Sequence, residues 1–419
     1  LFLVFLLTLA GLIYIYNVKS LYLFNKSSLL LIILFGILFR LVFVFSEPIL
    51  EDDFYRYLWD GAVLANGENP YEFSPKEIID GGGNEKLRLL ADDSGDIVNK
   101  INNPGLKTIY PTVAQMFFSL SYIISPWNVK VWKLILLGID LITLSLLILT
   151  FQQLKIPLTN ILIYWWNPLL VKEIFNSGHM DVIVFPLVLV SLLFFLKHRK
   201  YFSTAMLAMG VGIKLWPAFL FPLFLKPLIK KPKMLLINTA IFSVVAALIF
   251  SPVLLSQLDS SSGFVAYGKS WENNSSFFRI ILFSFEGLLN TINIHPGHAQ
   301  KYARILILII LAGWIGYVAF FNKSESIHKK ALLIIGLAYL VSPTQYPWYF
   351  TWVILLSAMT PHLSILSLTA LLPLYYSRYY FEPIGDFAFF HKVVVWFEFV
   401  PIWFFIFWEW KKGKLSITS

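Results

Sequence analysis

The sequence predicts an all-helical protein that crosses a membrane many times. Of its 419 residues, 58% are hydrophobic and 14% are charged, and the mean hydropathy is +0.72. A soluble chain of this composition could not bury so many long apolar runs. A β-barrel would show short alternating segments instead of continuous runs such as residues 29–45. We therefore expect about 11 to 13 transmembrane helices in a single integral membrane domain, residues 1–419.

The apolar runs set the order of the expected helices. Residues 1–16 and 29–45 form an opening hairpin, and we interpret the first run as a span because no basic segment precedes it, as one would in a cleaved signal. Two polar loops, residues 47–110 and 256–300, interrupt the later runs. Those later runs cover residues 111–124, 131–151, 158–171, 182–196, 201–225, 234–254, 303–321, 331–341, 349–359, 363–376 and 393–408.

The distribution of charge predicts the orientation in the membrane. Loop 47–110 holds 13 of the 24 acidic residues but only 6 of the 33 Lys and Arg, a local net charge of −7. The remainder, with 27 basic against 11 acidic residues, carries +16. Its lysines gather in short segments such as 226–233 and 411–414, which is typical of cytoplasmic loops, so loops 47–110 and 256–300 are expected outside. This pattern indicates the lipid bilayer, and not nucleic acid, as the partner.

A second basic segment conflicts with a simple count of spans. Residues 197–200, KHRK, also predict a cytoplasmic loop, although a single apolar run separates them from 226–233. Two half-helices broken at residues 212–217, where Gly and Pro occur, would bring both segments to the same side. We therefore expect a helix break beside Lys214.

The first polar loop opens with three consecutive carboxylates, Glu51, Asp52 and Asp53. From Asp52 onward the residues favour a helix in which Asp53 and Tyr57 share one face. Arg56 follows closely enough to pair with Asp52 or Asp53. One interpretation is a capped interfacial helix with solvated acids. The other is an acidic catalytic site at the membrane surface.

Polar side chains also gather at later junctions between apolar runs. Segment 165–181 contains His179 and Asp181, which indicate either an ordinary turn or a polar pocket, because ionisable groups beside apolar helices are costly. Their spacing alone does not define a metal site. Lys214 is either a snorkelling side chain or a clamp for an anionic head group. Residues 342–350, SPTQYPWYF, form either an aromatic belt or a stacking surface for a sugar.

Acids, cations and aromatic residues on one membrane face favour transfer of a group from a lipid phosphate. A glycosyl phosphate releases an anion, so it needs a cation to hold the developing charge and no acid catalyst. The acceptor hydroxyl needs one carboxylate that takes its proton during the attack. One base and one cation are therefore sufficient, whereas hydrolysis of an ordinary glycoside uses a pair of carboxyl groups.

The loop sequence EDDFYRYLWDGAVLANGENPYEF, followed by IYPTVAQ, resembles the first outer loop of the GT-C glycosyltransferases. The resemblance is closest to polyprenyl-phosphate-mannose-dependent mannosyltransferases, which include bacterial α-mannosyltransferases and the enzyme that adds the first mannose in GPI-anchor synthesis. Those proteins carry an acidic pair, an aromatic-rich helix, a Gly-x-x-Pro-Tyr turn (residues 67–71 here) and a Tyr-Pro-Pro-like start of the next span (residues 110–112). The segments WNPL, NSGHMD, GIKLWP, NNSS and SPTQYPWY follow in the expected order, so the likeness spans nearly the whole chain.

The resemblance implies inverting transfer of mannose, or another hexose, from a polyprenyl phosphate to a lipid-linked or glycan acceptor. The reaction is expected at the outer face of a bacterial cytoplasmic (inner) membrane. Asp53 is expected to be the general base, with Asp52 and Glu51 next in line. The residues expected to bind the donor or the acceptor are Lys214, Arg279, Gln345, Tyr346, Trp348, His179, Asp181, Arg56, Tyr57 and Asn274.

This chemistry requires no cofactor besides the donor substrate, polyprenyl-phosphate-mannose. If a divalent cation such as Mg²⁺ or Mn²⁺ is used, Glu51 and Asp53 are the residues to hold it, although Glu51 stands where the family pattern has Asp. The alternative function is a transporter or flippase for a lipid-linked sugar. A transporter should show repeat symmetry and ionisable residues near the membrane midplane. Asp140 is the only clear acid deep in an apolar run, which favours the enzyme.

Overall fold

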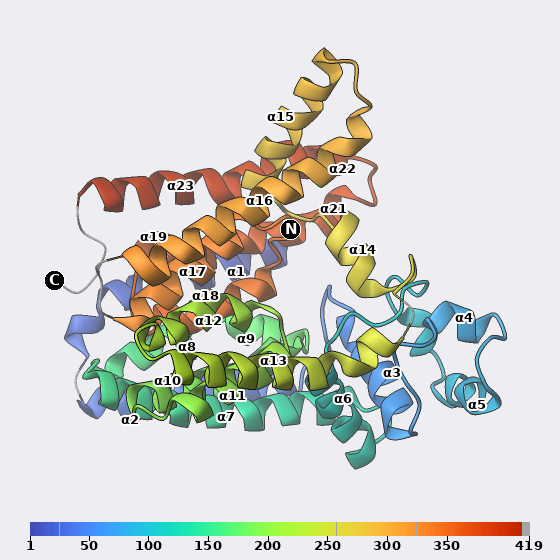
Figure 1. Ribbon diagram of the computed structural model, residues 1–419, viewed down its shortest axis with the longest axis horizontal. Coiled ribbons are helices and arrows are strands. Elements are labelled where there is room, and N and C mark those ends of the chain that lie inside the picture. The colour runs from blue at the N-terminus through green and yellow to red at the C-terminus, as the bar shows by residue number, and fades with distance from the viewer. Residues whose placement is uncertain (25, 257, 323–325, 413–419) are drawn as a thin grey trace. The chain divides into compact units, whose positions relative to one another are not determined.

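The computed structural model describes residues 1–24, 26–256, 258–322 and 326–412, and these residues form helices joined by turns and loops (Figure 1). The predicted all-helical class is confirmed. The chain divides into two compact units. Unit 1 comprises Leu1–Phe39, Phe151–Lys172 and Trp271–Ser419, and unit 2 comprises Arg40–Thr150 and Glu173–Ser270.

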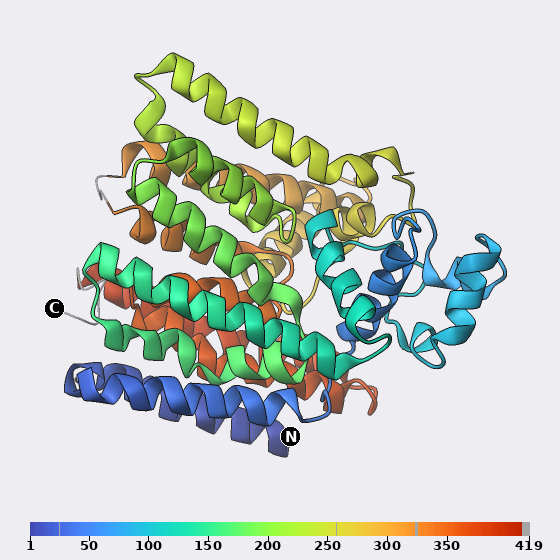
Figure 2. The ribbon, with the colours of Figure 1, turned by 90° about the horizontal axis from the view of Figure 1, so that it is seen from below.

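Unit 2 contains the first polar loop and the helices that follow it. Helices α10 and α11 pack against each other, and α11 packs against α13; Figure 2 shows them in green to yellow-green. The elements with residues in this unit are α2 (Lys26–Val44), α3 (Asp53–Ala65), α4 (Pro75–Ile79), α5 (Glu85–Asp93), η2 (Val98–Lys100), α6 (Thr112–Ile124), α7 (Val129–Leu154), η4 (Lys172–Asn176), η5 (Met180–Ile183), α10 (Val184–Leu196), α11 (Lys200–Val211), η6 (Trp216–Leu220), α12 (Phe221–Leu225), η7 (Lys226–Leu228), α13 (Pro232–Leu255) and α14 (Gly263–Ser270).

Unit 1 contains the first helix, the first part of the second and the C-terminal part of the chain. The indole of Trp165 donates a hydrogen bond to the Ile33 carbonyl of α2 over 3.0 Å, and a Cβ on Gly36 would lie 2.0 Å from that indole. Gly36 therefore allows the close approach. The remaining elements of the unit are α1 (Phe2–Lys19), η1 (Leu21–Leu23), η3 (Leu158–Asn160), α8 (Ile161–Trp165), α9 (Pro168–Val171), α15 (Phe277–Thr291), η8 (Pro296–His298), α16 (Ala299–Gly316), η9 (Tyr317–Phe321), α17 (Ile327–Val341), η10 (Pro347–Tyr349), α18 (Phe350–Ser357), α19 (Leu363–Leu366), α20 (Leu368–Leu371), η11 (Leu372–Ser377), α21 (Arg378–Phe381), α22 (Phe387–Phe389), η12 (Phe390–Val394) and α23 (Val395–Lys411).

Five helices in the described part of the chain are long and apolar enough to cross a membrane. A bent pair of helices, Pro168–Asn176 and Met180–Leu196, would add a sixth span, with a bend of 101°. Continuous spans are thus fewer than the 11 to 13 expected, because prolines and 3₁₀ turns divide apolar runs, as in Trp216–Leu228, into short pieces. Within the described part of the chain, the five helices that are long and apolar enough are Phe2–Lys19, Val129–Leu154, Pro232–Leu255, Pro296–Phe321 and Phe387–Lys411.

The first polar loop folds around α3. Helix α4 begins with a capping box, in which the Ser74 hydroxyl accepts from the Glu77 amide over 3.3 Å and the Glu77 carboxylate accepts from the Ser74 amide over 2.7 Å. Helix α5 begins at Asn84, whose side chain accepts from the Leu87 amide. An apolar cluster packs α3 against these helices through Trp59, Ala62, Val63, Ile78, Leu87, Leu90, Val98 and Ile101.

The predicted pair of half-helices is confirmed. Helix α11 ends before Gly212, and the chain returns through η6, α12 and η7. The Gly212 carbonyl accepts hydrogen bonds from the Val113 and Ala114 amides, over 3.0 and 3.2 Å, and so caps α6. A Cβ on Gly212 would lie 2.5 Å from the Val113 side chain, so a glycine is needed there. The two basic segments lie at one end of the unit, where His198 and Lys231 line one cavity.

The deep acid of the sequence has a structural partner. Arg40 Nε donates to Asp140 Oδ2 over 2.5 Å, and both side chains are fully buried. The Arg40 guanidinium also lies over the Phe175 ring, 5.2 Å from its centroid. A buried carboxylate needs such a partner in an apolar setting, so this pair accounts for Asp140 without a transport role.

Candidate active site

Asp53 is the first residue of α3, and groups from the following loop hold its carboxylate. Asn102 Nδ2 donates to Asp53 Oδ1 over 2.8 Å and to Asp52 Oδ1 over 2.7 Å. The Tyr110 hydroxyl donates to Asp53 Oδ2 over 3.4 Å. Asp52 is exposed, Glu51 is buried, and the Asp53 side chain is 20% exposed. Asp53 therefore combines fixed partners with access from solvent.

The electrostatic environment makes Asp53 a stronger base than an ordinary aspartate. Burial raises the pKa of Asp53, and repulsion from Asp52 and Asp181 raises it further. The hydrogen bond from Asn102 and the ammonium of Lys214 act in the opposite direction on this pKa. The net result is a raised pKa, which brings the carboxyl group closer to the range of an effective general base.

His179 lies between two carboxyl groups. Its Nδ1 is 3.7 Å from Asp53 Oδ2, and its Nε2 is 3.4 Å from Glu173 Oε2. The imidazole and Glu173 are fully buried. The turn before His179 uses Gly178 at φ +75°, and the Trp132 indole donates to the Gly178 carbonyl over 2.7 Å. The left-handed glycine and this indole thus place the imidazole beside α3.

Asn176 ties the same segment to the chain just before α3. Its Nδ2 donates to the Ser46 hydroxyl and to the Glu47 carbonyl, both over 2.8 Å. Its Oδ1 accepts from the Ile49 amide over 3.1 Å. With three hydrogen bonds across the two segments, the Asn176 side chain holds the His179 turn against the approach to the acidic residues.

Lys214 lies in the break between α11 and η6, as the sequence predicts. Its ammonium is 3.2 Å from Asp181 Oδ1. The Asp181 side chain is fully buried and that of Lys214 is 14% exposed. Two residues that the sequence indicated separately therefore form one ion pair, and both act electrostatically on Asp53.

Arg56 takes partners other than the acids expected for it. Its Nη1 is 3.9 Å from Asp60 Oδ1, and its Nη2 donates to the carbonyls of Asn103 and Leu106, over 3.2 and 2.9 Å. Burial raises the pKa of Asp60, while Arg56 counteracts that rise. Arg56 thus holds the loop that carries the hydrogen-bond donors of the candidate base.

Tyr57 belongs to an aromatic layer beneath the candidate base. Its ring stacks on Phe118 with centroids 4.7 Å apart and meets the Tyr110 ring edge-on at 5.0 Å. Trp132 lies 5.6 Å from the Tyr57 centroid. Because Tyr57 is buried among these rings, it supports Tyr110, whose hydroxyl contacts Asp53.

Five residues predicted to bind substrate belong to unit 1. Gln345 Nε2 donates to carbonyls at the end of α17 over 2.9 and 3.1 Å, and its Oε1 accepts from the Ser276 amide over 2.8 Å. Asn274 Nδ2 donates to Glu398 Oε2 over 2.7 Å and to the Gln345 carbonyl over 3.2 Å. These two side chains are buried and connect three segments of the unit. The five residues are Arg279, Gln345, Tyr346, Trp348 and Asn274.

Of the other three residues, Arg279 and Tyr346 are partly exposed, whereas Trp348 is buried. Arg279 Nε is 3.0 Å from Glu272 Oε1, and the arginine side chain is 25% exposed. The Tyr346 and Trp348 rings stack with centroids 4.3 Å apart, and the Tyr346 hydroxyl accepts from the Trp271 indole over 2.9 Å. This part of unit 1 thus contains a partly exposed cation and a pair of stacked aromatic rings, one of which is buried.

Sequence reasoning did not assign a role to Asn102, Tyr110 or Glu173, which contact the predicted site residues. Two of them had a local signal, because Tyr110 begins the Tyr-Pro motif at residues 110–112 and Glu173 precedes His179 in the same polar segment. Within the described residues, no group of three or more His, Cys, Asp or Glu side chains is arranged to hold a metal ion.

The fold and this site define a polytopic membrane protein with a buried cluster of carboxylates, imidazole and ammonium beside its first polar loop. The chain belongs to glycosyltransferase family 87, a family of GT-C-type membrane glycosyltransferases, whose family model matches residues 109–343, more than half of its length. That match includes His179, Asp181 and Lys214 and begins at the end of the loop that carries Asp53. No curated protein and no solved structure shows significant similarity to the chain.

Family membership confirms the predicted glycosyltransferase class and the integral membrane character. It therefore favours the enzyme over the alternative function, a transporter or flippase for a lipid-linked sugar. Membership of this family does not by itself identify the donor or the acceptor, so the more specific resemblance to mannosyltransferases stays a prediction.

Proposed function

We propose that the protein transfers mannose, or another hexose, from a polyprenyl phosphate to a lipid-linked or glycan acceptor. In this proposal the transfer inverts the anomeric centre, Asp53 is the general base, and the site opens on the outer face of a bacterial cytoplasmic membrane. The observation that carries the proposal is the partly exposed Asp53 carboxylate, which has a raised pKa and lies within the electrostatic reach of Lys214.

The role of Asp53 follows from the proton that an acceptor hydroxyl must lose. A carboxylate with a raised pKa accepts this proton more readily than an ordinary one. Asn102 and Tyr110 donate to its two oxygens and restrict its rotation, which favours a single orientation toward an incoming hydroxyl. Asp52 is the competing base, since it shares the Asn102 amide and is more exposed.

The role of Lys214 follows from the charge that develops on the leaving phosphate. The ammonium group of a lysine has three N–H donors, and Asp181 Oδ1 lies 3.2 Å from the Lys214 Nζ. The Lys214 side chain is 14% exposed, so a phosphate oxygen can approach its ammonium group. A cation held in a largely desolvated position stabilises that oxygen more strongly than it would in bulk water. Asp181 then acts as the positioning group for Lys214.

His179 is proposed to position Asp53. The His179 imidazole lies between the carboxyl groups of Asp53 and Glu173 and limits the space in which the Asp53 side chain can rotate. The stacked aromatic pair Tyr346 and Trp348 is proposed as a contact for the sugar or for the lipid-linked acceptor, since stacked rings suit both. Arg279 is proposed as a further contact for the substrate.

The proposed steps use no metal ion. A requirement for Mg²⁺ or Mn²⁺ would assign the ion to Glu51 and Asp53. Incubation with EDTA, followed by addition of each ion, tests this point directly: activity that survives EDTA supports the metal-independent scheme, and activity that returns only with an ion contradicts it.

The donor class can be tested with purified protein. We expect transfer of label from radiolabelled polyprenyl-phosphate-mannose to a membrane glycolipid fraction, and no transfer from nucleotide-mannose. The Asp53→Asn variant, incubated in parallel, should transfer none above background. Turnover with the nucleotide donor alone would refute the proposal.

A further inference from the structure

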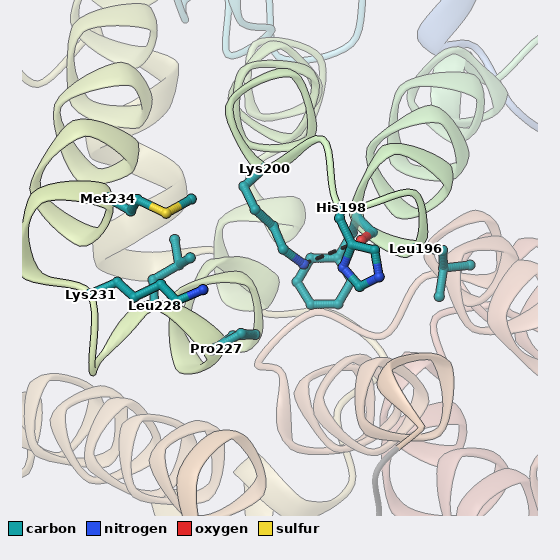
Figure 3. Close-up of a pocket in the computed structure, with 8 residues that line it drawn as sticks. Leu196, His198, Lys200, Pro227, Leu228, Lys231 and Met234 are labelled. Carbon is teal, nitrogen blue, oxygen red and sulfur yellow. Dashed lines mark hydrogen bonds between the residues drawn. The ribbon is translucent and has the colours of Figure 1, made fainter.

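A cavity of about 530 Å³ lies in unit 2 where α10 ends and where α11 and α13 begin (Figure 3). His198, Lys200 and Lys231 line it together with the apolar side chains of Phe195 and Leu228. Figure 3 shows the two lysines and the histidine directed into the same space. The 12 residues of α11, about 18 Å of helix, separate this end from the break that carries the candidate phosphate clamp. The cavity is therefore distinct from the candidate active site.

The two lysines of the cavity carry like charges and lie close enough to act on each other electrostatically. Lys200 Nζ donates to the Phe195 carbonyl over 3.2 Å and lies 3.5 Å from the centroid of the Phe195 ring. Burial lowers the pKa of Lys200, and repulsion from Lys231 lowers it further. An anion placed between two such ammonium groups would remove this repulsion and form charge-assisted hydrogen bonds with both.

Two helix N-termini reinforce the preference for an anion. Helix α11 begins at Lys200, and α13 begins directly after Lys231. Neither N-cap residue, Arg199 or Lys231, makes a side-chain capping hydrogen bond. The positive ends of both helix dipoles therefore add to the charge of the lysines at this cavity.

The surroundings of the cavity suit a lipid rather than a fully hydrated ligand. Phe195 and Leu228 give it an apolar wall. Helix α13 starts at the cavity, and only 6% of its apolar span is buried. Leu236, Val244 and Leu248 along that helix are 71%, 56% and 69% exposed. An acyl chain can therefore lie along α13 while its head group occupies the cavity.

We propose that this cavity binds the phosphate head group of an anionic membrane phospholipid. Lys200 and Lys231 contact the phosphate, and the acyl chains follow the exposed face of α13. The site is independent of the proposed transfer reaction, because it uses none of the residues assigned to that reaction.

The proposal is tested by lipid binding to the purified full chain in a neutral detergent. Native mass spectrometry counts the bound lipid as short-chain phosphatidylglycerol, phosphatidylcholine or inorganic phosphate is titrated in separate arms. We expect phosphatidylglycerol to bind in preference to the other two. The double variant Lys200→Gln/Lys231→Gln should bind it roughly tenfold or more weakly, since both charge-assisted contacts are lost. A matched control, Lys230→Gln/Lys233→Gln, removes the same charge from exposed positions of the same segment and should bind like the parent.

Each other outcome overturns the proposal. Equal binding of phosphatidylglycerol and phosphatidylcholine would show that the anion is not recognised. Inorganic phosphate that binds as tightly as the lipid would make this a site for free phosphate. If the test and control variants lose the same amount of phosphatidylglycerol binding, the binding depends on the overall charge of the loop and not on the two lysines of the cavity. If Lys200→Gln impairs folding, Lys231→Gln alone provides the test, because the Lys231 side chain is exposed.

Discussion

Replacing Asp53 with asparagine tests the proposed base with little disturbance of the fold. The amide keeps an oxygen that can accept from Asn102, and its nitrogen can donate to the Tyr110 hydroxyl, which also accepts hydrogen bonds. A carboxyl group whose pKa rises on folding destabilises the folded state at pH values above that raised pKa. The neutral side chain should therefore leave the melting temperature unchanged or slightly higher.

The expected loss of activity is large because asparagine cannot take a proton. General-base catalysis contributes about 10²–10⁴-fold, which corresponds to about 2.7–5.4 kcal/mol of transition-state stabilisation. Asp60 cannot replace Asp53, since it lies seven residues further along α3, about 10 Å away, and is held by Arg56 and Gln115. The assay is transfer from polyprenyl-phosphate-mannose at saturating acceptor, with donor binding measured separately.

Asp52→Asn is the matched control, since Asp52 shares the Asn102 amide but is exposed. We expect this variant to remain within about tenfold of the parent. It should also lower the pKa of Asp53, because repulsion from Asp52 contributes to the raised value. If both variants stay within tenfold of the parent, the acidic stretch is a capped interfacial helix and the catalytic role of Asp53 is refuted.

Three further predictions concern the clamp, the pH profile and the topology. Lys214→Gln should reduce catalytic efficiency for the donor by roughly 10- to 100-fold with normal expression, whereas donor kinetics within twofold of the parent would leave Lys214 without a role in phosphate binding. Because the pKa of Asp53 is raised and the base acts when deprotonated, kcat/KM should fall as the pH drops through a value above that of an ordinary aspartate; an acidic limb near pH 4 would contradict this. A cysteine introduced at Ser94 or Ser261 should react with an impermeant thiol reagent in intact cells and one at Ser326 should not, and the native chain has no cysteine to interfere. Labelling at Ser326 alone would invert the predicted orientation.

Local sequence signals were sufficient for features that depend on neighbouring residues. The start of α3 at Asp53 follows from acids before a helix-forming stretch. The break beside Lys214 follows from nearby glycine and proline and from two basic segments that must share one end. These features depend on backbone preferences and on the cost of charge in an apolar setting, both of which can be read along the chain.

Contacts between distant segments could not be predicted in the same way. Asn102 lies 49 residues after Asp53, in a loop whose path depends on the packing of α3, α4 and α5. The polar character of Gln345 and Asn274 indicated a binding surface, yet their amides bond mainly to backbone groups and to Glu398. Residue type shows that a side chain can form hydrogen bonds, but only the fold determines which partner it finds.

Within unit 2, two hydrogen-bond contacts and a few residues of backbone connect Asp53 to the segment that carries Lys214. The Tyr110 hydroxyl donates to Asp53, and three residues later the Val113 amide donates to the Gly212 carbonyl. Lys214 follows Gly212 by two residues in the helix break. The start of α6 thus contacts the acidic loop through a side chain and the break through its first amides. Because a side chain at Gly212 would collide with Val113, the close contact between α6 and the break depends on this glycine. Two segments that lie far apart in the sequence thereby set the positions of the proposed proton acceptor and the proposed phosphate clamp relative to each other, which the proposed inverting transfer requires.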